Sequence, residues 1–191
     1  MSVRAQIVVP VKGFAAGKTR LAAALDDADR IALLRRLTER TVAIAVALPE
    51  VHVVVVSPDP DVAAFAADLG ATAVHRRDDG LNEALTAVAR TLPERRTLIL
   101  PIDLPLLEPC DIEAHIACDG VGLSPDARET GTNLLSVPAP LSIRFGFGDG
   151  SRDRHARRAR DAGLQFHLIR RPGLAFDLDT PDDLLRLGDW P

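Results

Sequence analysis

A loop that combines glycines with basic residues follows the first apolar segment of the chain and carries the strongest chemical signal. The segment at residues 7–21 reads IVVPVKGFAAGKTRL. Its glycines let backbone N–H groups approach phosphate oxygens closely, and its basic side chains neutralise the charge of a polyphosphate. We therefore expect the loop to bind a triphosphate, with Lys18 and Arg20 as catalytic candidates. The candidate phosphate-binding residues are Lys12, Gly13, Lys18 and Arg20.

The spacing of this loop differs from that of a P-loop. The P-loop pattern requires a glycine five residues before Gly17, and Lys12 occupies that position. The nearest glycine, Gly13, comes one residue later. Phosphate binding is therefore better supported than a P-loop fold, and a P-loop kinase or GTPase is a weaker alternative.

Asp103 is an isolated carboxylate inside an apolar run. The run reads TLILPIDLPLL, so Asp103 should lie just after a buried strand, at the edge of the core. An ionised carboxylate there needs a cation or several hydrogen-bond donors, and a divalent metal ion is the simplest partner. The alternative is that Asp103 caps the helix that starts near Pro109.

Asp177 and Asp179 lie in the segment AFDLDTP, where alternation places both carboxylates on the same face of a strand end. Asp179 directly precedes Thr180 and can cap the last helix, which leaves Asp177 as the better metal ligand. The DxD spelling also invites a glycosyltransferase interpretation, but alone it is weak. Two carboxylates with Mg²⁺ beside a phosphate loop are the components of nucleotidyl or phosphoryl transfer.

A second candidate anion site lies in the C-terminal half of the chain. Residues 131–133 (GTN) precede an apolar strand, and residues 145–151 (FGFGDGS) open a basic helix. A glycine-rich turn that leads into a helix N-terminus beside a hydroxyl group can bind an anion. We expect Thr132, Gly148 and Ser151 to contribute to it, although the glycines could instead form a hairpin turn. A solvated basic face is our interpretation for Arg157, Arg158 and Arg160.

These candidates lie between short apolar segments and helical patterns that alternate along the chain. The alternation predicts an α/β fold with a doubly wound, mixed but mostly parallel sheet and helices on both faces. In such sheets ligands bind beyond the carboxyl ends of the strands. Expected strands cover residues 6–11, 51–57, 71–75, 97–101, 120–124, 133–137, 165–169 and 174–178. Expected helices cover residues 29–48, 62–69, 82–92, 153–162 and 181–187, the last with Thr180 as its N-cap.

Composition narrows the class of protein. The 191 residues, 47% of them hydrophobic, fit a single domain over residues 1–191. The net charge is −4, and the absence of Tyr with only one Trp argues against a stacking surface for nucleic acids. Cys110 and Cys118 lack CxxC spacing, and the sequence has neither a signal peptide nor a run of about 20 apolar residues. We therefore expect a cytoplasmic protein with reduced thiols and neither a nucleic-acid nor a membrane partner.

Six motifs give the chain a family resemblance. The chain contains, in this order, VPVKGFAAGKTRLA, GLNEAL, PIDLPLL, GTNLL, FGDGSRDRH and DLDTPDDL, which together span nearly its whole length. In these motifs it resembles the 2-phospho-L-lactate guanylyltransferases of coenzyme F420 biosynthesis. The resemblance implies the nucleotidyltransferase (GT-A-like) form of the doubly wound sheet. It also implies that Mg²⁺ is the cofactor, that GTP and a small phosphorylated acid react, and that pyrophosphate leaves.

The resemblance also implies roles for particular residues. It implies metal binding at Asp103 and Asp177, in agreement with the ranking of the carboxylates from their positions. It further implies that the phosphate and carboxylate of the acceptor acid contact Thr132, Gly148 and Ser151. These two sets place a metal and an acceptor in one site.

Two details of the motifs are ambiguous. The doubled spelling FGFG leaves open whether the acceptor turn starts at Phe145 or at Phe147. In related nucleotidyltransferases amide groups help to read the base, and Asn82 in GLNEAL is the matching nucleotide-binding amide here. Asn82 can equally cap its own helix.

The sequence leaves several alternatives for function. A sugar or molybdenum-cofactor nucleotidyltransferase shares the fold, and a non-catalytic module would bind GTP without metal-dependent turnover. The acceptor can be 2-phospho-L-lactate, phosphoenolpyruvate or 3-phospho-D-glycerate, because one or two pocket side chains can distinguish these acids. A homodimer is only the default expectation for a small enzyme.

Overall fold

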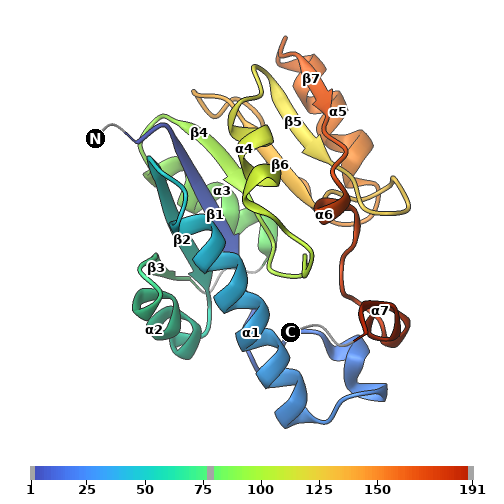
Figure 1. Cartoon of the computed structure of the whole chain (residues 1–191). Coiled ribbons are helices and arrows are strands. Elements are labelled where there is room, and N and C mark those ends of the chain that lie inside the picture. The colour runs from blue at the N-terminus through green and yellow to red at the C-terminus, as the bar shows by residue number, and fades with distance from the viewer. Residues whose placement is uncertain (1–2, 77–79, 189–191) are drawn as a thin grey trace.

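The structure is a computed structural model that describes residues 3–76 and 80–188. Its strands are β1 (Ala5–Pro10), β2 (Val51–Ser57), β3 (Thr72–His75), β4 (Arg96–Ile99), β5 (Val121–Ser124), β6 (Leu134–Val137) and β7 (Phe166–Leu168). Both halves of the chain contribute to one seven-stranded sheet in the order β3-β2-β1-β4-β6-β5-β7 (Figure 1). Neighbouring strands are parallel except that β6 pairs antiparallel with β4 and β5. The prediction of a mixed, mostly parallel sheet is therefore confirmed.

Helices cover both faces of this sheet (Figure 1). They are α1 (Asp27–Val46), α2 (Pro60–Asp68), α3 (Leu81–Thr91), α4 (Pro109–Ile116), α5 (Ser151–Asp161), α6 (Pro172–Ala175), α7 (Pro181–Leu187) and the 3-10 helix η1 (Thr19–Ala23). Successive residues of β1 serve two apolar cores, because side chains alternate along a strand. Ile7 and Val9 pack with α1, α2 and α4, whereas Val8 packs with α3 and α5 on the opposite face. The doubly wound arrangement is thus confirmed.

The prediction of a strand at residues 174–178 is wrong. Pro172 in the first turn begins the short helix α6, since its fixed φ suits that position. The chain then runs extended from Phe176, but it bonds to the loop after β4 rather than to a strand: Leu178 N–H donates to the Asp103 carbonyl oxygen at 2.9 Å. The alternation that suggested a strand therefore anchors two carboxylates near Asp103 instead of extending the sheet.

The start of α7 is fixed by a capping box. Thr180 is the N-cap, as predicted, and its hydroxyl accepts a hydrogen bond from Asp183 N–H, while the Asp183 carboxylate accepts one from Thr180 N–H at 2.8 Å. The alternative that Asp179 caps this helix is therefore wrong. Because α7 lies beside η1, Asp179 instead faces the loop that carries Lys18 (Figure 1).

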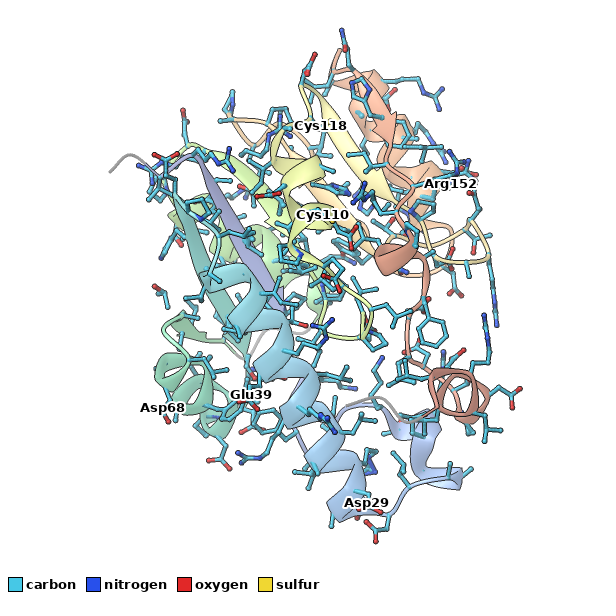
Figure 2. The ribbon with its side chains drawn as sticks, viewed as in Figure 1. Asp29, Glu39, Asp68, Cys110, Cys118 and Arg152 are labelled. Atoms are coloured by element: carbon cyan, nitrogen blue, oxygen red, sulfur yellow. The ribbon has the colours of Figure 1, made fainter. Side chains whose placement is uncertain are left out.

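The two cysteines lie at opposite ends of α4 (Figure 2). Cys110 is in the first turn of the helix and Cys118 follows its end, and both are free thiols, in line with the expectation from the sequence. Among the helices that the structure describes, none is long and apolar enough to cross a bilayer.

Candidate active site

One cavity at the carboxyl ends of β1 and β4 collects most of the predicted site residues. Its volume is about 490 Å³, and its walls include Pro10 at the end of β1, the turn that opens α5 and the segment that leads into α7. A site in this position agrees with the general rule for doubly wound sheets. The predicted residues that line the cavity are Arg20, Asp103, Thr132, Gly148, Ser151 and Asp177.

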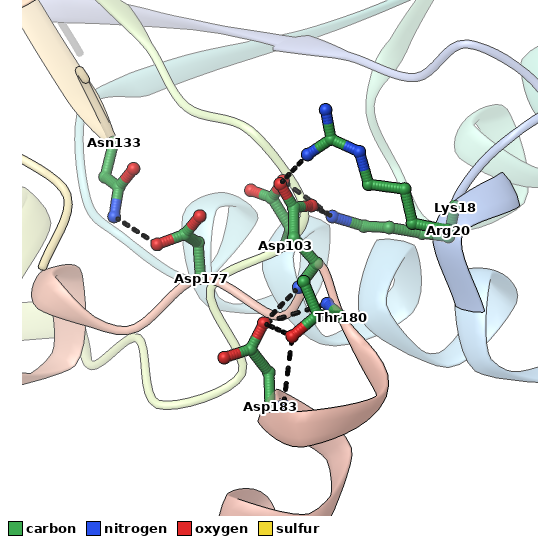
Figure 3. A network of polar contacts seen from close by, with 8 residues as sticks. Lys18, Arg20, Asp103, Asn133, Asp177, Thr180 and Asp183 are labelled. Carbon is green, nitrogen blue, oxygen red and sulfur yellow. Dashed lines mark hydrogen bonds and ion pairs between the residues drawn. The ribbon is translucent and has the colours of Figure 1, made fainter. Parts of the chain in front are cut away.

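Lys18 forms the charged link between the phosphate loop and the two carboxylate segments. Its backbone has the left-handed conformation (φ 50°), and its ammonium group lies 2.8 Å from Asp103 Oδ2 and 2.5 Å from Asp179 Oδ1. Arg20 Nη1 approaches Asp179 Oδ2 at 3.7 Å from the exposed side. In Figure 3 Lys18 and Arg20 approach the carboxylates from one side, and Asp177 lies on the other side of Asp103. Three segments that are distant in sequence therefore meet in one ion-pair network.

The ion pairs keep Lys18 protonated. Burial works to lower the pKa of the Lys18 ammonium, but the charges of Asp103 and Asp179 outweigh it and raise that pKa above its ordinary value. Only 9% of the Lys18 side chain is exposed. A buried cation so placed neutralises the two carboxylates, and its binding to a phosphate stays a prediction.

Asp177 lies where it repels Asp103. Burial raises the pKa of the Asp177 carboxyl, and the negative charge of Asp103 raises it further, while a long hydrogen bond from Asn133 Nδ2 (3.4 Å) opposes the shift. Both carboxylates line the same cavity. Two mutually destabilised carboxylates gain from a shared cation, which is the electrostatic condition for a metal site.

These donors fit a magnesium ion that is completed by substrate. Across residues 3–76 and 80–188 no group of three or more His, Cys, Asp or Glu side chains is arranged to hold a metal ion. Mg²⁺, however, usually binds one or two carboxylates and takes its remaining ligands from water and substrate phosphates. Asp103 and Asp177 match that requirement. Lys18 pairs with Asp103 as well as with Asp179, but only Asp179 has Arg20 as a second basic partner.

Three predicted nucleotide-binding residues of the loop, Lys12, Gly13 and Lys18, lie outside the cavity lining. Lys12 is exposed. Gly13 is buried with φ 138°, and a Cβ there would lie 3.2 Å from Asp59 Oδ2, so the turn and its packing against Asp59 already require glycine. Phe14 N–H donates to the same Asp59 oxygen at 3.3 Å. Phosphate binding by Lys12 and Gly13 stays a prediction.

Asn82 has a partner that the sequence did not indicate. Its Oδ1 accepts from Phe147 N–H at 2.7 Å and its Nδ2 donates to the Phe147 carbonyl oxygen at 3.2 Å. The alternative role as a helix cap is wrong, because Gly80 is the N-cap of α3. Both polar atoms of the amide therefore tie α3 to the acceptor turn, and base recognition by Asn82 stays a prediction.

The predicted acceptor residues are brought together at the N-terminus of α5. Ser151, only 1% exposed, has its Oγ 3.0 Å from Thr132 Oγ1. Gly148 has φ 111°, a conformation that favours glycine, and it lines the cavity, whereas Gly146 does not. The cavity lining favours the turn that starts at Phe147, and contact of Gly148 with an acceptor acid stays a prediction.

Arginine side chains of α5 donate hydrogen bonds to backbone carbonyl oxygens in and before this turn. Arg154 donates to the carbonyl oxygens of Gly146 (2.7 Å) and Asp149 (2.8 Å), and Arg158 donates to that of Arg144 (2.9 Å). Arg158 is partly exposed, so it belongs to the solvated face in part, and its guanidinium also bonds the loop. Exposed side chains are found, as expected, at Arg157 and Arg160.

Sequence reasoning assigned no role to His155, which is fully buried behind the acceptor residues. Its Nδ1 lies 3.1 Å from Thr132 Oγ1, and its Nε2 accepts from Gly146 N–H at 2.9 Å. The available signal was its spacing: Ser151 and His155 are four residues apart, so a helix places them on one face. The ion pair between Asp179 and Lys18 was also not predicted, because the two residues are 161 positions apart in the sequence.

A family model described as "Guanylyl transferase CofC like" matches residues 5–188. A phosphoenolpyruvate guanylyltransferase from Rubrobacter xylanophilus is 41% identical over 187 residues, covering 94% of this chain and 91% of that protein. A 3-phospho-D-glycerate guanylyltransferase from Phenylobacterium zucineum is 35% identical over 198 residues, covering 98% of this chain and 91% of its own length. The similarity therefore spans all the motifs that line the cavity.

Solved structures show the same fold at low sequence identity. A nucleotide-diphospho-sugar transferase from Desulfovibrio desulfuricans, described as putative, superposes with a TM-score of 0.74 at 16% identity, covering 94% of this chain and 84% of that one. A CMP:2-keto-3-deoxy-manno-octonic acid synthetase complexed with CTP gives a TM-score of 0.67 at 14% identity, with 96% of each chain covered. The nucleotidyltransferase (GT-A-like) form of the sheet is thereby confirmed.

Proposed function

We propose that this chain, which belongs to the CofC-like guanylyl transferase family, transfers the GMP unit of GTP to the phosphate of a small phosphorylated acid. The acid class comprises phosphoenolpyruvate, 3-phospho-D-glycerate and 2-phospho-L-lactate, and the similarity to phosphoenolpyruvate guanylyltransferases makes phosphoenolpyruvate the first acid to test. The guanylylated acid would enter coenzyme F420 biosynthesis.

The observation that carries this proposal is the mixed lining of the cavity. Leu81 and Leu85 of α3 supply apolar side chains to the lining, and Thr132 and Ser151 are lining residues that carry hydroxyl groups. Asp103 and Asp177 lie on the same cavity. This mixed lining supports a site that takes a nucleoside and an anionic acid together, with the reacting phosphates near the carboxylates.

Asp103 and Asp177 would hold Mg²⁺, since their mutual repulsion is relieved by a divalent cation. A bound Mg²⁺ would neutralise charge on the phosphates of GTP. Lys18 would then exchange its carboxylate partners for the β- and γ-phosphates, and Arg20 would neutralise the same leaving group. The carboxylates and the triphosphate are thus alternative partners of the Lys18 ammonium group.

The reaction requires no dedicated general base. A phosphate monoester carries most of its second negative charge near neutral pH, so its oxygen is already a nucleophile. That oxygen forms a bond to the α-phosphorus of GTP while the bond from the α-phosphorus to the bridging oxygen breaks, and pyrophosphate leaves. The protein's task is to hold two anions in line, which Thr132, Gly148 and Ser151 perform for the acid.

A product assay tests the proposal. The chain is incubated with GTP, Mg²⁺ and each of the three acids in turn, and the products are identified by mass. We expect one guanosine-diphospho acid with an equal amount of pyrophosphate. Release of inorganic phosphate, or GTP binding without any acid-dependent product, would contradict the proposal.

The metal assignment is tested by Asp103→Asn. We expect turnover to fall by about a thousandfold or more. A neutral amide binds a divalent cation more weakly than a carboxylate does, so the charge on the phosphates of GTP would no longer be neutralised. Asp68→Asn, an exposed change on α2 far from the cavity, is the matched control and should turn over like the unchanged chain (Figure 2). Near-normal turnover of Asp103→Asn would overturn the assignment.

A further inference from the structure

The acceptor hydroxyls belong to a hydrogen-bond chain that runs back into the protein. Ser151 Oγ lies 3.0 Å from Thr132 Oγ1, which lies 3.1 Å from His155 Nδ1. On the other side of the ring, Nε2 accepts from Gly146 N–H at 2.9 Å. Ser151 and Thr132 line the cavity, whereas His155 is 0% exposed behind them.

The Gly146 N–H group fixes the tautomer of His155. A backbone N–H can only donate, so Nε2 must present a lone pair to it. Burial, aided by the charges of Arg158 and Arg154, lowers the pKa of His155 to about 4, so the ring is neutral near pH 7. A neutral imidazole has one N–H group, and with Nε2 as acceptor that N–H is on Nδ1.

This tautomer leaves the hydroxyl pair with a spare proton. Nδ1–H donates to Thr132 Oγ1, so the ring cannot accept a proton from either hydroxyl. Of the two hydroxyl protons of Thr132 and Ser151, one forms the hydrogen bond between them. The other has no acceptor among the bonds that the described residues form, and both oxygens border the cavity. It is free to meet an oxygen of a bound anion.

The opposite tautomer would close the chain. With the proton on Nε2, Ser151 would donate to Thr132 and Thr132 to Nδ1, which consumes both hydroxyl protons. The pair would then offer an approaching anion only lone pairs. The tautomer of one buried ring therefore decides whether the hydroxyl pair attracts or repels a phosphate or carboxylate oxygen.

The ring is held in place from the far side of the turn. Phe147 packs edge-on against His155 with 5.1 Å between ring centroids. The Asn82 amide bonds both the N–H and the carbonyl oxygen of Phe147, so α3 fixes the residue that follows Gly146. This support keeps the Gly146 N–H group aimed at Nε2.

We infer that His155 is a positioning residue that, as the Nδ1–H tautomer, makes the Ser151–Thr132 hydroxyl pair a hydrogen-bond donor to an anionic oxygen of the acceptor acid. The inference rests on the proposed function for the identity of that acid. It concerns the acceptor alone, because His155 contacts neither the carboxylates nor Lys18 among its described partners.

A double-mutant cycle tests the role of His155 through Thr132. His155→Phe keeps a ring beside Phe147 but removes both nitrogens, and we expect it to raise the KM for the acid about tenfold to a hundredfold with the KM for GTP within about twofold. His155→Asn places an amide N–H near the position of Nδ1 and should recover part of the loss. In a Thr132→Val background, His155→Phe should change the KM for the acid by no more than about twofold. The same loss in both backgrounds would overturn the inference.

Nitrogen NMR of the uniformly ¹⁵N-labelled chain gives a readout that needs neither turnover nor a variant that folds well. Two-bond correlations show which ring nitrogen carries the proton, and we expect Nδ1–H for His155 at pH 7. Titration with phosphoenolpyruvate should shift the His155 signals and leave those of the remote, buried His115 unchanged. A proton on Nε2, or unshifted His155 signals at saturating acid, would overturn the inference. A chain with the expected tautomer and shift but no guanylylated product would instead contradict only the proposed function.

Discussion

Two buried histidines of this protein have the same kind of partners and opposite consequences. His115 and His155 are both 0% exposed, and both contact hydroxyl groups through ring nitrogens. At His115, Ser124 Oγ donates to the Ile169 carbonyl oxygen, so it accepts from Nε2–H at 2.8 Å, and Nδ1 is left to accept from Ser136 Oγ at 3.2 Å. Every proton of the His115 network is thus used within the protein.

The two networks differ in the group that lies beyond the hydroxyl. Ser124 has a backbone carbonyl oxygen to bond, so His115 joins α4 to strands β5 and β6 and closes the network. In front of His155 the hydroxyls face the cavity, so their network is completed only by a ligand. A closed network stabilises the fold, whereas an open one of the same composition prepares a binding site.

The largest expected effect concerns the property that the two networks share, which is a buried neutral histidine. It is a loss of folding stability at acidic pH. Burial lowers the pKa of His115 to about 3 and that of His155 to about 4, with Arg96 adding to the first and Arg158 to the second. In the unfolded chain both histidines have a pKa near 6.5, so below that pH they bind protons that they do not bind in the folded chain. Stability is therefore fully present above about pH 6.5 and falls toward pH 4, by roughly 1.4 kcal/mol per pH unit for each histidine.

Urea unfolding between pH 7 and pH 5 measures this slope. His155→Phe should retain about half of it, because His115 still titrates. A free energy of unfolding that is flat over this range would show that the rings are not buried as neutral groups, and the comparison would fail.

Serine substitutions separate the two networks. Ser124→Ala should lower the free energy of unfolding by about 2 kcal/mol, because it leaves a buried ring N–H and a carbonyl oxygen without hydrogen-bond partners. The KM for the acid should stay unchanged. Ser151→Ala should cost less than about 1 kcal/mol, since its hydroxyl faces the cavity, but it should raise the KM for the acid severalfold. Paired denaturation and kinetic measurements on both variants make the check. Equal effects on stability and KM would erase the distinction between the networks.

Asn82→Ala has the smallest expected effect and sharpens the account of the open network. Loss of the two bonds to Phe147 should loosen the acceptor turn and raise the KM for the acid about threefold, with GTP still preferred over ATP. Steady-state kinetics with both nucleotides decides the point. A lost preference for GTP with an unchanged KM for the acid would instead make Asn82 a base-reading residue.

The sequence predicts the fold to the extent that local patterns determine it. The apolar runs that became β1, β2 and β4, the helix pattern of α1 and the Thr180 cap all follow from periodicity and capping chemistry over a few residues. Residues 174–178 did not, because alternation alone does not tell an extended segment bonded to a loop from a strand bonded to a sheet.

The candidate site was predicted in its parts but not in its connections. Residue type and position identified Asp103, Asp177 and Ser151, since carboxylates after strands and hydroxyls at a glycine-rich turn have few other uses. The pairing of Lys18 with Asp179 could not be predicted, because it depends on where α7 packs. His155 was likewise hidden, since its role follows from a single backbone N–H group in a loop.

The measurement that tests the central claim most directly traces the fate of the α-phosphorus of GTP. The chain is incubated with Mg²⁺, phosphoenolpyruvate and GTP labelled with ³²P at the α-position, beside a sample labelled at the γ-position. The account predicts that the α-label joins the acid in a guanylylated product, that the γ-label leaves as pyrophosphate in equal amount, and that neither occurs without the acid. An α-label that stays in GDP while the γ-label leaves as inorganic phosphate would contradict it.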